Sequence, residues 1–407
     1  MDTMTKSSKV ETNLSDRVNR LAESETLLMA RKSRELQAQG LDIISLTLGE
    51  PDFNTPDYVK EAAKKAIDEN YTRYTPVCGY NELKVAIANK LKRENNLDYN
   101  PLQILVSAGA KHSIANAVMA LVNHGEEVII PSPYWVSYKE LVRLAQGNCV
   151  CPVATIENDF KITAKQLEAS ITDKTKLIIF SSPCNPSGSV YSKEELRSLA
   201  NVIASHDDLY VISDEIYEHI NFVGKHESIA QFEFIKDRVI LINGVSKAYA
   251  MTGWRIGYMA APDWIIKACD KLQGQMTSGV CSIAQKAAEA ALNGDIKFVE
   301  EMVATFKERR DLVFNLMNKI PGIKINKPDG AFYVFPDVSY YFGKTDGQTY
   351  ISNSSDLSMY LLNKALVSMV PGDAFGSPEC LRLSYATSND KLIEAIKRIE
   401  KALSELK

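Results

Sequence analysis

Runs of consecutive apolar residues alternate with amphipathic stretches over the middle of the chain. Seven such runs lie between residues 103 and 261. Strands that are apolar at every position, not at every second one, are typical of sheets buried on both faces, which are largely parallel. We therefore predict strands over 104–106, 127–131, 148–153, 177–181, 209–213, 239–243 and 256–261.

Helical periodicity precedes this region. Residues 15–39 carry charged residues around spaced leucines and stop at Gly40, which predicts one helix. The apolar run 43–48 predicts an extended segment that turns into a loop at its glycine and proline. Thr55 and Pro56 predict a helix start, with Thr55 as the N-cap and Pro56 at the first helical position. The buried faces of this helix and the next are marked by Val59, Ala62, Ala63 and Ala66, then Leu83, Ile87 and Leu91.

The pattern changes again beyond about residue 290. A long helix is expected over 296–317, followed by an antiparallel pair of segments, 330–335 and 381–385. A final amphipathic helix starts near Ser388 and repeats apolar residues every three or four positions. The fold class expected is α/β, with a mostly parallel sheet flanked by helices in a large domain, plus a smaller α+β domain.

Length and charge limit the class of protein. A chain of 407 residues is too long for one small core, so two domains are expected. The net charge of −4 argues against a nucleic-acid scaffold, and no apolar run reaches the length that spans a bilayer. The polar start of the chain, Met1 to Leu14, has no apolar signal core, and the seven cysteines have no Cys-x-x-Cys pair. We expect a cytoplasmic protein with reduced thiols packed as small apolar residues and with no metal site.

Candidate chemistry centres on Lys247, which follows the predicted strand 239–243. Ser246 precedes it, and Arg255 comes eight positions later between Gly253 and Gly257. A partly desolvated lysine has a lowered pKa and can form an imine with an aldehyde, while a hydroxyl and a guanidinium suit a phosphate. An aldehyde with a phosphate tail is pyridoxal phosphate. Taken alone, however, a lysine after a strand is usually a solvated charge.

Polar residues follow other strands at the edge where ligands of parallel sheets bind. Asp214 ends the strand 209–213 and could hold a protonated pyridine nitrogen, with Tyr217 and Asn185 as donors to a phenolate oxygen. Asp214 could equally cap a helix, and Asn185 could form a turn. Gly109, Ala110 and Lys111 lie where a strand gives way to a helix, which suits a phosphate.

Three further residues are candidates for contact with a ring or a substrate. Trp135 offers a flat face for stacking, or is a core tryptophan. Arg382 alternates with apolar residues and could grip a carboxylate in a cleft, or be an exposed strand arginine. Gly49 lies in a loop that could close over a substrate, or is a plain turn glycine.

These motifs, in this order, resemble the class I aminotransferases, and most of all their prokaryotic-type aspartate aminotransferase subgroup. The resemblance extends from about Leu46 to Tyr385. It is carried by the segments 48–53 (LGEPDF), 74–76 (YTP), 133–138 (PYWVSY), 213–217 (SDEIY), 246–247 (SK) and 251–255 (MTGWR).

The resemblance implies a role for each candidate residue. Lys247 would carry the Schiff base of pyridoxal 5′-phosphate, Asp214 would hold its ring nitrogen, and Arg382 would bind the substrate α-carboxylate. Gly49, Trp135 and Asn185 are the other positions at which family members contact the amino-acid substrate. The loop of Tyr74 would reach the phosphate of the neighbouring subunit, so the resemblance also implies a homodimer with shared active sites. The family fold implies a large domain of residues 46–294 and a small domain of residues 1–45 with 295–407.

The substrate class follows less directly. The resemblance places Lys111 where a cation would favour aspartate and glutamate over neutral amino acids, and Lys111 facing solvent is the alternative. We expect transamination between aspartate and 2-oxoglutarate. An aminotransferase that prefers prephenate, aromatic or neutral amino acids stays open, as does a carbon–sulfur lyase or an aminocyclopropane-carboxylate synthase-like enzyme on the same fold. A ligand-sensing regulator needs a DNA-binding domain ahead of Gly49, for which the preceding residues leave no room.

Overall fold

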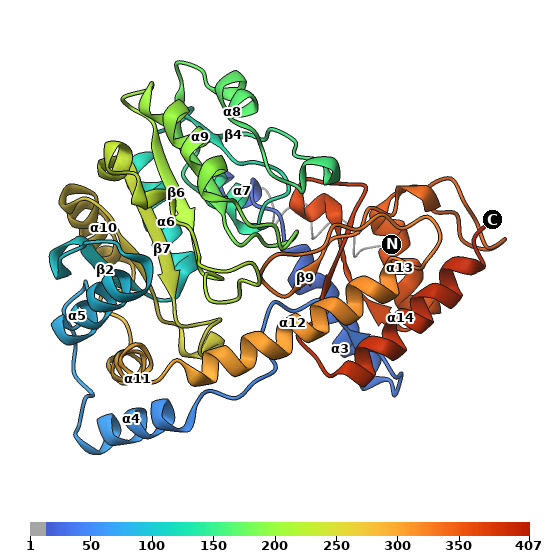
Figure 1. Ribbon diagram of the computed structural model, residues 1–407, viewed down its shortest axis with the longest axis horizontal. Helices are drawn as coiled ribbons and strands as arrows, with labels where there is room; N and C mark the ends of the chain where they lie inside the picture. The colour runs from blue at the N-terminus through green and yellow to red at the C-terminus, as the bar shows by residue number, and fades with distance from the viewer. Residues whose placement is uncertain (1–13) are drawn as a thin grey trace.

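A seven-stranded sheet forms the centre of the larger part of the molecule (Figure 1). The computed structural model describes residues 14–407. The strands lie in the order β2-β8-β7-β6-β5-β3-β4. Their bounds are β2 Ile104–Ser107, β3 Glu127–Ile129, β4 Asn148–Val150, β5 Thr175–Ser181, β6 Tyr210–Asp214, β7 Val239–Gly244 and β8 Gly257–Ala260.

The sheet is mostly parallel, as the continuous apolar runs predict. Strands β4, β3, β5, β6 and β7 pair in parallel, and only β8 runs antiparallel to both of its neighbours, β7 and β2. All seven predicted strands are present: β3, β4 and β8 are shorter than expected by two or three residues, β2, β5 and β7 are longer by one or two, and β6 is shifted by one. The α/β fold class is confirmed.

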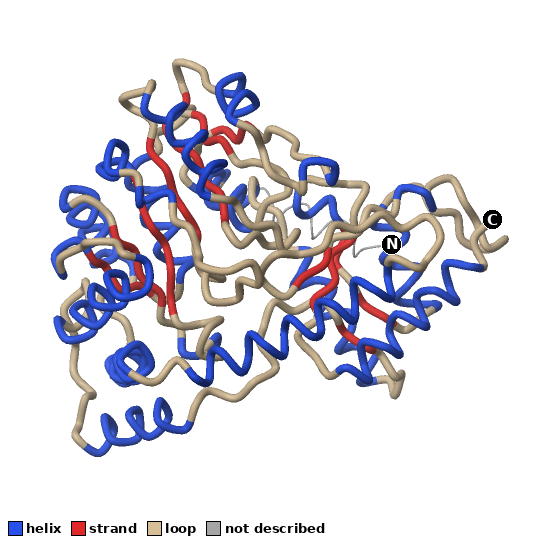
Figure 2. The backbone as a smooth tube through the Cα atoms, viewed as in Figure 1, coloured by secondary structure: helices blue, strands red, loops and turns tan. Residues whose placement is uncertain are grey.

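Successive strand residues point to opposite faces, and both faces are covered by helices (Figure 2). In β7, for example, Val239 and Leu241 pack on one face, whereas Ile240 and Ile242 pack on the other. Helices α4, α5, α9 and α11 cover the first face and α6, α7 and α10 the second. Their bounds are α4 Asp57–Asp68, α5 Asn81–Lys90, α6 Ala110–Leu121, α7 Ser137–Leu144, α9 Lys193–Ala204, α10 Asp263–Met276 and α11 Ser282–Asn293; the short α8, Ala164–Ser170, contacts α9.

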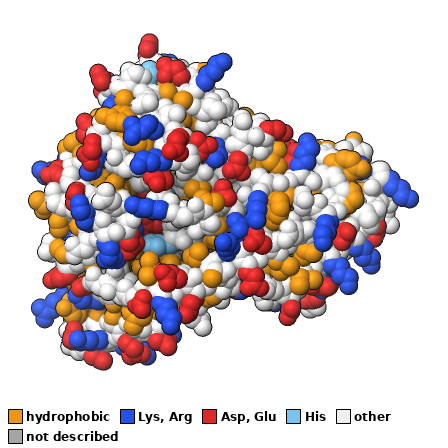
Figure 3. Space-filling view, viewed as in Figure 1, with side chains coloured by type: hydrophobic (Ala, Val, Ile, Leu, Met, Phe, Trp, Pro, Cys, Tyr) orange, Lys and Arg blue, Asp and Glu red, His pale blue; other side chains and the backbone are white. Residues whose placement is uncertain are grey.

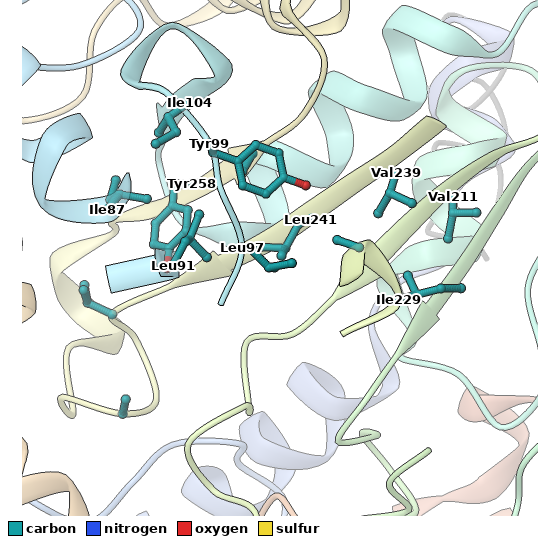
Figure 4. Close-up of a cluster of buried hydrophobic side chains, with 14 of the residues drawn as sticks. Ile87, Leu91, Leu97, Tyr99, Ile104, Val211, Ile229, Val239, Leu241 and Tyr258 are labelled. Atoms are coloured by element: carbon teal, nitrogen blue, oxygen red, sulfur yellow. The ribbon is translucent and has the colours of Figure 1, made fainter. Parts of the chain in front are cut away.

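The core on the first face extends beyond the strands and helices. Helix α5 continues into a π-helical segment, Leu91–Asn95, and then into a loop that leads to β2. Figure 4 shows side chains of this stretch, Leu91, Leu97 and Tyr99, in one cluster with residues of β6, β7 and β8. The π-helical segment and the loop after it are thereby packed against the sheet.

The rest of the chain forms a narrower part joined to the sheet by the long helix α12, Lys297–Met317 (Figure 1). It contains a three-stranded antiparallel sheet in the order β11-β12-β9 and a parallel pair, β1 with β10. This pair places a segment that precedes the large sheet in the chain beside a segment that follows it. The remaining bounds are β1 Ile44–Ser45, β9 Tyr333–Val334, β10 Val367–Ser368, β11 Val370–Pro371, β12 Leu381–Ser384, α13 Ser354–Lys364 and α14 Asn389–Ser404.

A second hydrophobic core fills this narrower part. Phe306 of α12 stacks on Phe332 with ring centroids 5.1 Å apart, and both are fully buried. Residues of α13, α14 and β12 complete the cluster, together with Ile216, Tyr217 and Ile220 from the segment after β6. The division into domains at residues 45/46 and 294/295 stays a prediction.

Two of the predicted helices differ from the structure in detail. The expected helix over 15–39 is two helices, α2 Asp16–Asn19 and α3 Glu25–Ala38, because the chain turns between them. Helix α4 begins at Asp57 with Pro56 as its N-cap residue, because the Thr55 hydroxyl donates to the carbonyl of Ala250 instead of capping the helix. The prediction that Met1 to Leu14 contains no signal core lies, Leu14 apart, outside the described residues.

The cysteines are all described, and all seven are free thiols. Cys184, Cys269 and Cys380 are buried as expected, whereas Cys281 is exposed, so packing as small apolar residues holds only for some of them. Within residues 14–407 no helix is long and apolar enough to cross a bilayer. On the face shown in Figure 3, acidic and basic side chains are interspersed.

Candidate functional site

A cavity of about 290 Å³ lies between the carboxyl ends of the strands and the narrower part of the molecule. Strands β5 and β6 end at it in Ser181 and Asp214, and Ser246 and Lys247 of its wall follow β7. All but two of the residues expected in the site line this cavity. They are Gly49, Ala110, Lys111, Trp135, Asn185, Asp214, Tyr217, Ser246, Lys247, Arg255 and Arg382.

The two expected residues that do not line the cavity are Gly109 and Tyr74. Gly109 lies behind the wall, and its N–H already donates to the carbonyl of Ser107 over 2.7 Å. Tyr74 is fully exposed and lines a separate surface hollow with Cys281 and its neighbours. Neither residue therefore lines the cavity.

Lys247 lies in the turn that follows β7. Its Nζ donates to the carbonyl oxygen of Gly49 over 2.5 Å, which joins the two sides of the cavity. Burial lowers the pKa of Lys247 to about 8; the positive charges of Arg255 and Arg382 act in the same direction, and Glu50 and Asp214 oppose them. An amine with this pKa is neutral far more often than an ordinary lysine and is a better nucleophile and base.

Asp214 is the last residue of β6 and is almost fully buried. Its Oδ2 accepts a hydrogen bond from the Tyr138 hydroxyl over 2.6 Å, and its Oδ1 accepts one from the N–H of Ile216 over 3.3 Å. Burial raises the pKa of Asp214 to about 6, although both hydrogen bonds act in the opposite direction. At neutral pH it is therefore a buried carboxylate suited to a cationic partner.

Tyr217 faces the cavity one turn after Asp214. Its hydroxyl lies 2.7 Å from that of Tyr333, in β9, so the two tyrosines link the sheet to the narrower part. Gly49 has no room for a side chain, because a Cβ atom there would collide with the Tyr333 hydroxyl. Gly49 is thus required by close approach of the loop to Tyr333, not only by a turn.

Arg382 is buried at the base of the cavity. Nη1 donates to Oδ1 of Asn185 over 3.0 Å and Nη2 to the carbonyl of Thr47, but Nε has no hydrogen-bond partner among the described residues. The guanidinium lies between the rings of Tyr333 and Phe375, at 4.7 and 4.9 Å from their centroids. Within residues 14–407 this guanidinium has no carboxylate partner and keeps one unpaired donor, so it is suited to an anionic ligand.

The start of α6 forms the opposite wall with Arg255. Arg255 has φ +58°, and its guanidinium donates to the carbonyls of Thr252 and Ala108 over 2.8 and 3.2 Å. Gly109, with φ +84°, allows this contact, because a Cβ there would collide with the guanidinium. The N-terminus of α6, the guanidinium and the Ser246 hydroxyl together form a set of donors suited to a phosphate.

Lys111 and Trp135 lie together at the rim. The Lys111 Nζ is 4.9 Å from the centroid of the Trp135 ring, within the range of a cation–π contact. Partial burial lowers the pKa of Lys111, and the positive charge of Arg255 adds to the effect. The side chain is exposed, as the alternative to a binding role expects, yet it also lines the cavity.

Several residues of the site were not identified from the sequence. Tyr138 is hydrogen-bonded to Asp214, and Tyr333 to Tyr217. Both tyrosines belong to segments named in the sequence analysis. Tyrosines among apolar residues, however, are typical of a hydrophobic core. Ser24, Thr26 and Leu27, at the start of α3, also line the cavity. They lie more than twenty residues before Gly49, and no local pattern points to them.

Carboxylates and imidazoles that could hold a metal lie outside the cavity. Within the described residues they form two overlapping groups, Glu94 with Glu218 and His219, and Glu215 with Glu218 and His226. Lys90 already places its ammonium group against Glu218. A cation is therefore present in this cluster without a metal ion.

The cavity residues fit a ligand with an aldehyde, a basic ring nitrogen and a phosphate. Lys247 supplies the amine, Asp214 the carboxylate, and Arg255 the phosphate contact. The unpaired Nε of Arg382 is left for a second, carboxylate-bearing ligand. This set of side chains fits pyridoxal phosphate together with a carboxylate-bearing ligand.

Comparison with known proteins identifies the family of this architecture. The family model described as "Aminotransferase class I and II" matches residues 41–399. A bifunctional aspartate aminotransferase and glutamate/aspartate-prephenate aminotransferase of Petunia hybrida is 49% identical over 98% of this chain and 84% of its own length. The aspartate/prephenate aminotransferase of Nitrosomonas europaea is 47% identical over 96% of this chain and all of its own.

Solved structures agree over nearly the whole chain. The aspartate aminotransferase from Rhizobium meliloti has a TM-score of 0.94 and 42% identity, and covers 97% of this chain and 100% of that one. The Thermus thermophilus aspartate aminotransferase with maleate has a TM-score of 0.91 and 39% identity, covering 96% and 99%.

The buried carboxylate of Asp214 predicts a measurable effect on stability. In the folded chain its pKa rises from 3.8 to about 6, so ionisation at higher pH is penalised only in the folded state. Above pH 6 the ionised Asp214 lowers the free energy of unfolding by the full amount of this penalty. The penalty disappears as the pH falls towards 3.8. We expect Asp214→Asn to raise the free energy of unfolding, without added ligand, by about 1–3 kcal/mol at pH 8 and by less at pH 5.

Urea denaturation of both chains at the two pH values measures this difference. The exposed substitution Asp208→Asn is the control and should change stability little at either pH. An Asp214→Asn chain that is no more stable than the wild type at pH 8 would contradict the raised pKa.

Proposed function

This chain belongs to the class I and II aminotransferase family, and from that premise we propose that it transfers the amino group of aspartate to 2-oxoglutarate, using pyridoxal 5′-phosphate bound around Lys247. The observation that carries the proposal is the meeting of three buried charged groups in one cavity. These are an amine of lowered pKa, a carboxylate at a strand end and an arginine with an unpaired donor.

Each part of the cofactor would have its own residues. Lys247 would hold the aldehyde carbon and Asp214 the ring nitrogen, while Tyr217 and Asn185 would donate to the phenolate oxygen. Ser246, Arg255 and the backbone N–H groups of Ala110 and Lys111 would hold the phosphate, and Trp135 would lie against the ring. When bound, pyridoxal phosphate supplies an electron sink for the electrons of the Cα–H bond.

Lys247 is placed to move the proton. Because its pKa is about 8, a substantial fraction of the amine is neutral near neutral pH and can accept the substrate Cα proton, then donate it again. The hydrogen bond from Nζ to Gly49 holds the amine at the side of the cavity that the loop of Gly49 lines. The same residue thus acts as base and as acid, and two half-reactions give ping-pong kinetics.

Arg382 would bind the substrate α-carboxylate. Its guanidinium is held by Asn185 and Thr47 and packed between two aromatic rings, so the fork is oriented before substrate arrives. An oriented fork loses less conformational entropy on binding and selects a planar carboxylate.

Lys111 supports a preference for dicarboxylic substrates. Its ammonium group lies at the rim on the Trp135 ring, in a cavity whose base carries Arg382. A second cation near the mouth can bind the distal carboxylate of aspartate or glutamate. The relatives named as aspartate aminotransferases, one of them with the dicarboxylate maleate, support this choice.

Prephenate is a second candidate substrate. Two relatives with near-complete coverage carry it in their names, and prephenate also has a second carboxylate that Lys111 could bind. The preference between the two substrates depends on how well the rim accommodates a ring, so both belong in the same assay.

The proposal is tested with a panel of amino donors and 2-oxo acceptors that includes prephenate. We expect the protein with pyridoxal phosphate to convert aspartate and 2-oxoglutarate into oxaloacetate and glutamate. Lys247→Ala removes the amine that holds the cofactor and moves the proton, so it should turn over negligibly and lose the absorbance of the imine with the cofactor. Near-normal turnover by that variant, or release of an elimination product from aspartate, would exclude the proposed reaction.

The role of Lys111 predicts a selective loss. In Lys111→Ala we expect kcat/KM for aspartate to fall about 10-fold or more, since a charge-assisted contact of about 1.5–3 kcal/mol is removed, and that for alanine or phenylalanine to change little. Lys307→Ala, a substitution of an exposed lysine on α12, is the matched control. Equal losses for aspartate and alanine would reject a role in selectivity.

We further propose a homodimer in which Tyr74 completes the site of the partner subunit. Tyr74 is fully exposed and does not reach the cavity of its own chain, which supports a role across an interface. Sedimentation equilibrium should give twice the mass of the 45.3 kDa chain.

Hybrid dimers test the sharing directly. A hybrid of a Lys247→Ala subunit and a Tyr74→Phe subunit would contain one site with the wild-type residue at both positions, because the intact tyrosine comes from the first subunit and the intact lysine from the second. Tyr74→Phe in both subunits should weaken cofactor binding. We expect the hybrid to have wild-type cofactor affinity at half of its sites. Retention of the Tyr74→Phe defect at those sites would show that Tyr74 serves its own subunit.

A further inference from the structure

Behind the cavity, on the far side of the segment after β6, lies a largely buried cluster of charged and polar side chains that the proposed reaction does not use. We call it the turn network. Its members come from α5, the π-helical segment, the segment after β6 and the loop beyond it, and are Lys90, Glu94, Asn95, Glu215, Glu218, His219 and His226.

The segment 214–218 divides its side chains between two sides. Asp214 and Tyr217 line the cavity, whereas Glu215 and Glu218 point into the turn network. The backbone between them is a tight turn, in which the N–H of Glu218 donates to the carbonyl of Glu215 over 2.9 Å. Movement of the two glutamates must therefore move the two cavity residues.

Glu218 is held by three groups. The ammonium group of Lys90 binds its Oε1, the amide of Asn95 donates to its Oε2 over 2.6 Å, and the ring of His219 lies 3.5 Å from Oε1. Burial alone would raise the pKa of Glu218, but the charges of Lys90, His219 and His226 hold it well below its ordinary value. Glu218 is thus a buried, ionised anchor.

Glu215 is held by a separate set of donors. The hydroxyls of Ser213 and Ser228 donate to its Oε1 over 2.9 and 2.6 Å, and Nε2 of His226 lies 2.9 Å from its Oε2. Its N–H donates to the carbonyl of Ile242 in β7 over 2.9 Å. The carboxylate therefore joins β6 to the loop of residues 226–228, and the backbone of the same residue bonds β7.

A metal site is the alternative use of these groups, and Lys90 argues against it. Lys90 is completely buried, and its Nζ lies within 3.5 Å of Glu94 as well as bonding Glu218 and Asn95. An ion in the same place would have to displace an ammonium group that already balances the carboxylates.

Stability alone does not account for the turn network. Removing ionic groups from water costs free energy that their attraction often only just repays, so apolar side chains of similar volume would stabilise such a site equally well. What directed ion pairs and hydrogen bonds add is a defined position for each atom. The opposite side of the segment is already fixed by Ile216, Tyr217 and Ile220 in the second hydrophobic core.

We propose that Glu215 and Glu218 are positioning residues, which hold Asp214 and Tyr217 at the places where the cofactor ring is bound. This inference rests on the proposed function, because it assumes that Asp214 and Tyr217 contact the cofactor. In this arrangement the π-helical segment and the loop of residues 226–228 act on the cofactor only through the turn.

The test separates position from stability. We compare Glu218→Gln, Lys90→Met and the double variant Lys90→Met/Glu218→Met, measuring the urea denaturation midpoint and the dissociation constant of pyridoxal phosphate for the full chain freed of cofactor. Each single variant removes the nearest charged partner of one buried group and should lose both stability and affinity. The double variant should regain most of the wild-type midpoint but bind the cofactor about 10-fold more weakly, as loss of outer contacts does at other sites.

Two controls keep the result interpretable. Leu199→Ala, in the hydrophobic core on the same face of the sheet, should lower the midpoint without changing the dissociation constant. If the charged variants do not fold, Asn95→Ala removes the amide between Lys90 and Glu218 but keeps both charges, and should weaken cofactor binding by less than the double variant does.

Recovery of both stability and affinity in the double variant would overturn the inference, because the network would then be structural only. Loss of affinity on treatment of the wild type with a chelator would overturn it in favour of a metal site. Failure of the wild type to bind pyridoxal phosphate at all would reject the proposed function, and the inference with it.

Discussion

The structure depends on burying three charged groups in one cavity without pairing them fully with one another. Lys247, Asp214 and Arg382 each lose hydration, and the pKa of each shifts towards its neutral form, upward for the acid and downward for the two bases. If these groups served only the stability of the fold, apolar side chains would stand in their place or each charge would be paired with an opposite one. Here each keeps an unpaired interaction that a ligand can satisfy, which raises the free energy of the empty site and increases the gain on binding.

The sheet places these groups because strand direction and side-chain alternation leave little freedom. Five parallel strands bring their carboxyl ends to one edge, so Asp214 at the end of β6 and Lys247 after β7 must lie near each other. Arg382 comes from a different sheet, and its approach requires a contact between the two parts of the molecule. That contact runs through Gly49, whose carbonyl accepts from Lys247 and whose missing side chain leaves room for the Tyr333 hydroxyl.

Much of this could be predicted from the sequence, because strand ends and short motifs are local. The seven strands, the long helix α12 and eleven cavity residues follow from apolar runs and from the resemblance carried by segments such as 213–217. Tyr138 and Tyr333 could not be predicted, since only the tertiary fold shows which polar atoms their hydroxyls reach. Gly109 was assigned to the phosphate from its place before a helix, whereas its N–H is taken by Ser107 and it makes room for Arg255. The break between α2 and α3 was missed because no glycine or proline marks it.

The same limit explains why the turn network is invisible in the sequence. Glu215 and Glu218 stand three positions apart in a segment where Asp214 and Tyr217 already have a chemical interpretation, and their partners Lys90 and His226 are distant or unremarkable in the chain. A tight turn has two sides, and a cofactor can occupy only one of them. If a carboxylate must be held to within a fraction of an ångström on the cavity side, some fixed contact is needed on the other. Directed ionic contacts provide such a contact while changing the net stability of the fold little. A buried cluster of charged residues behind an active site is therefore a place to look for residues that set the geometry of that site.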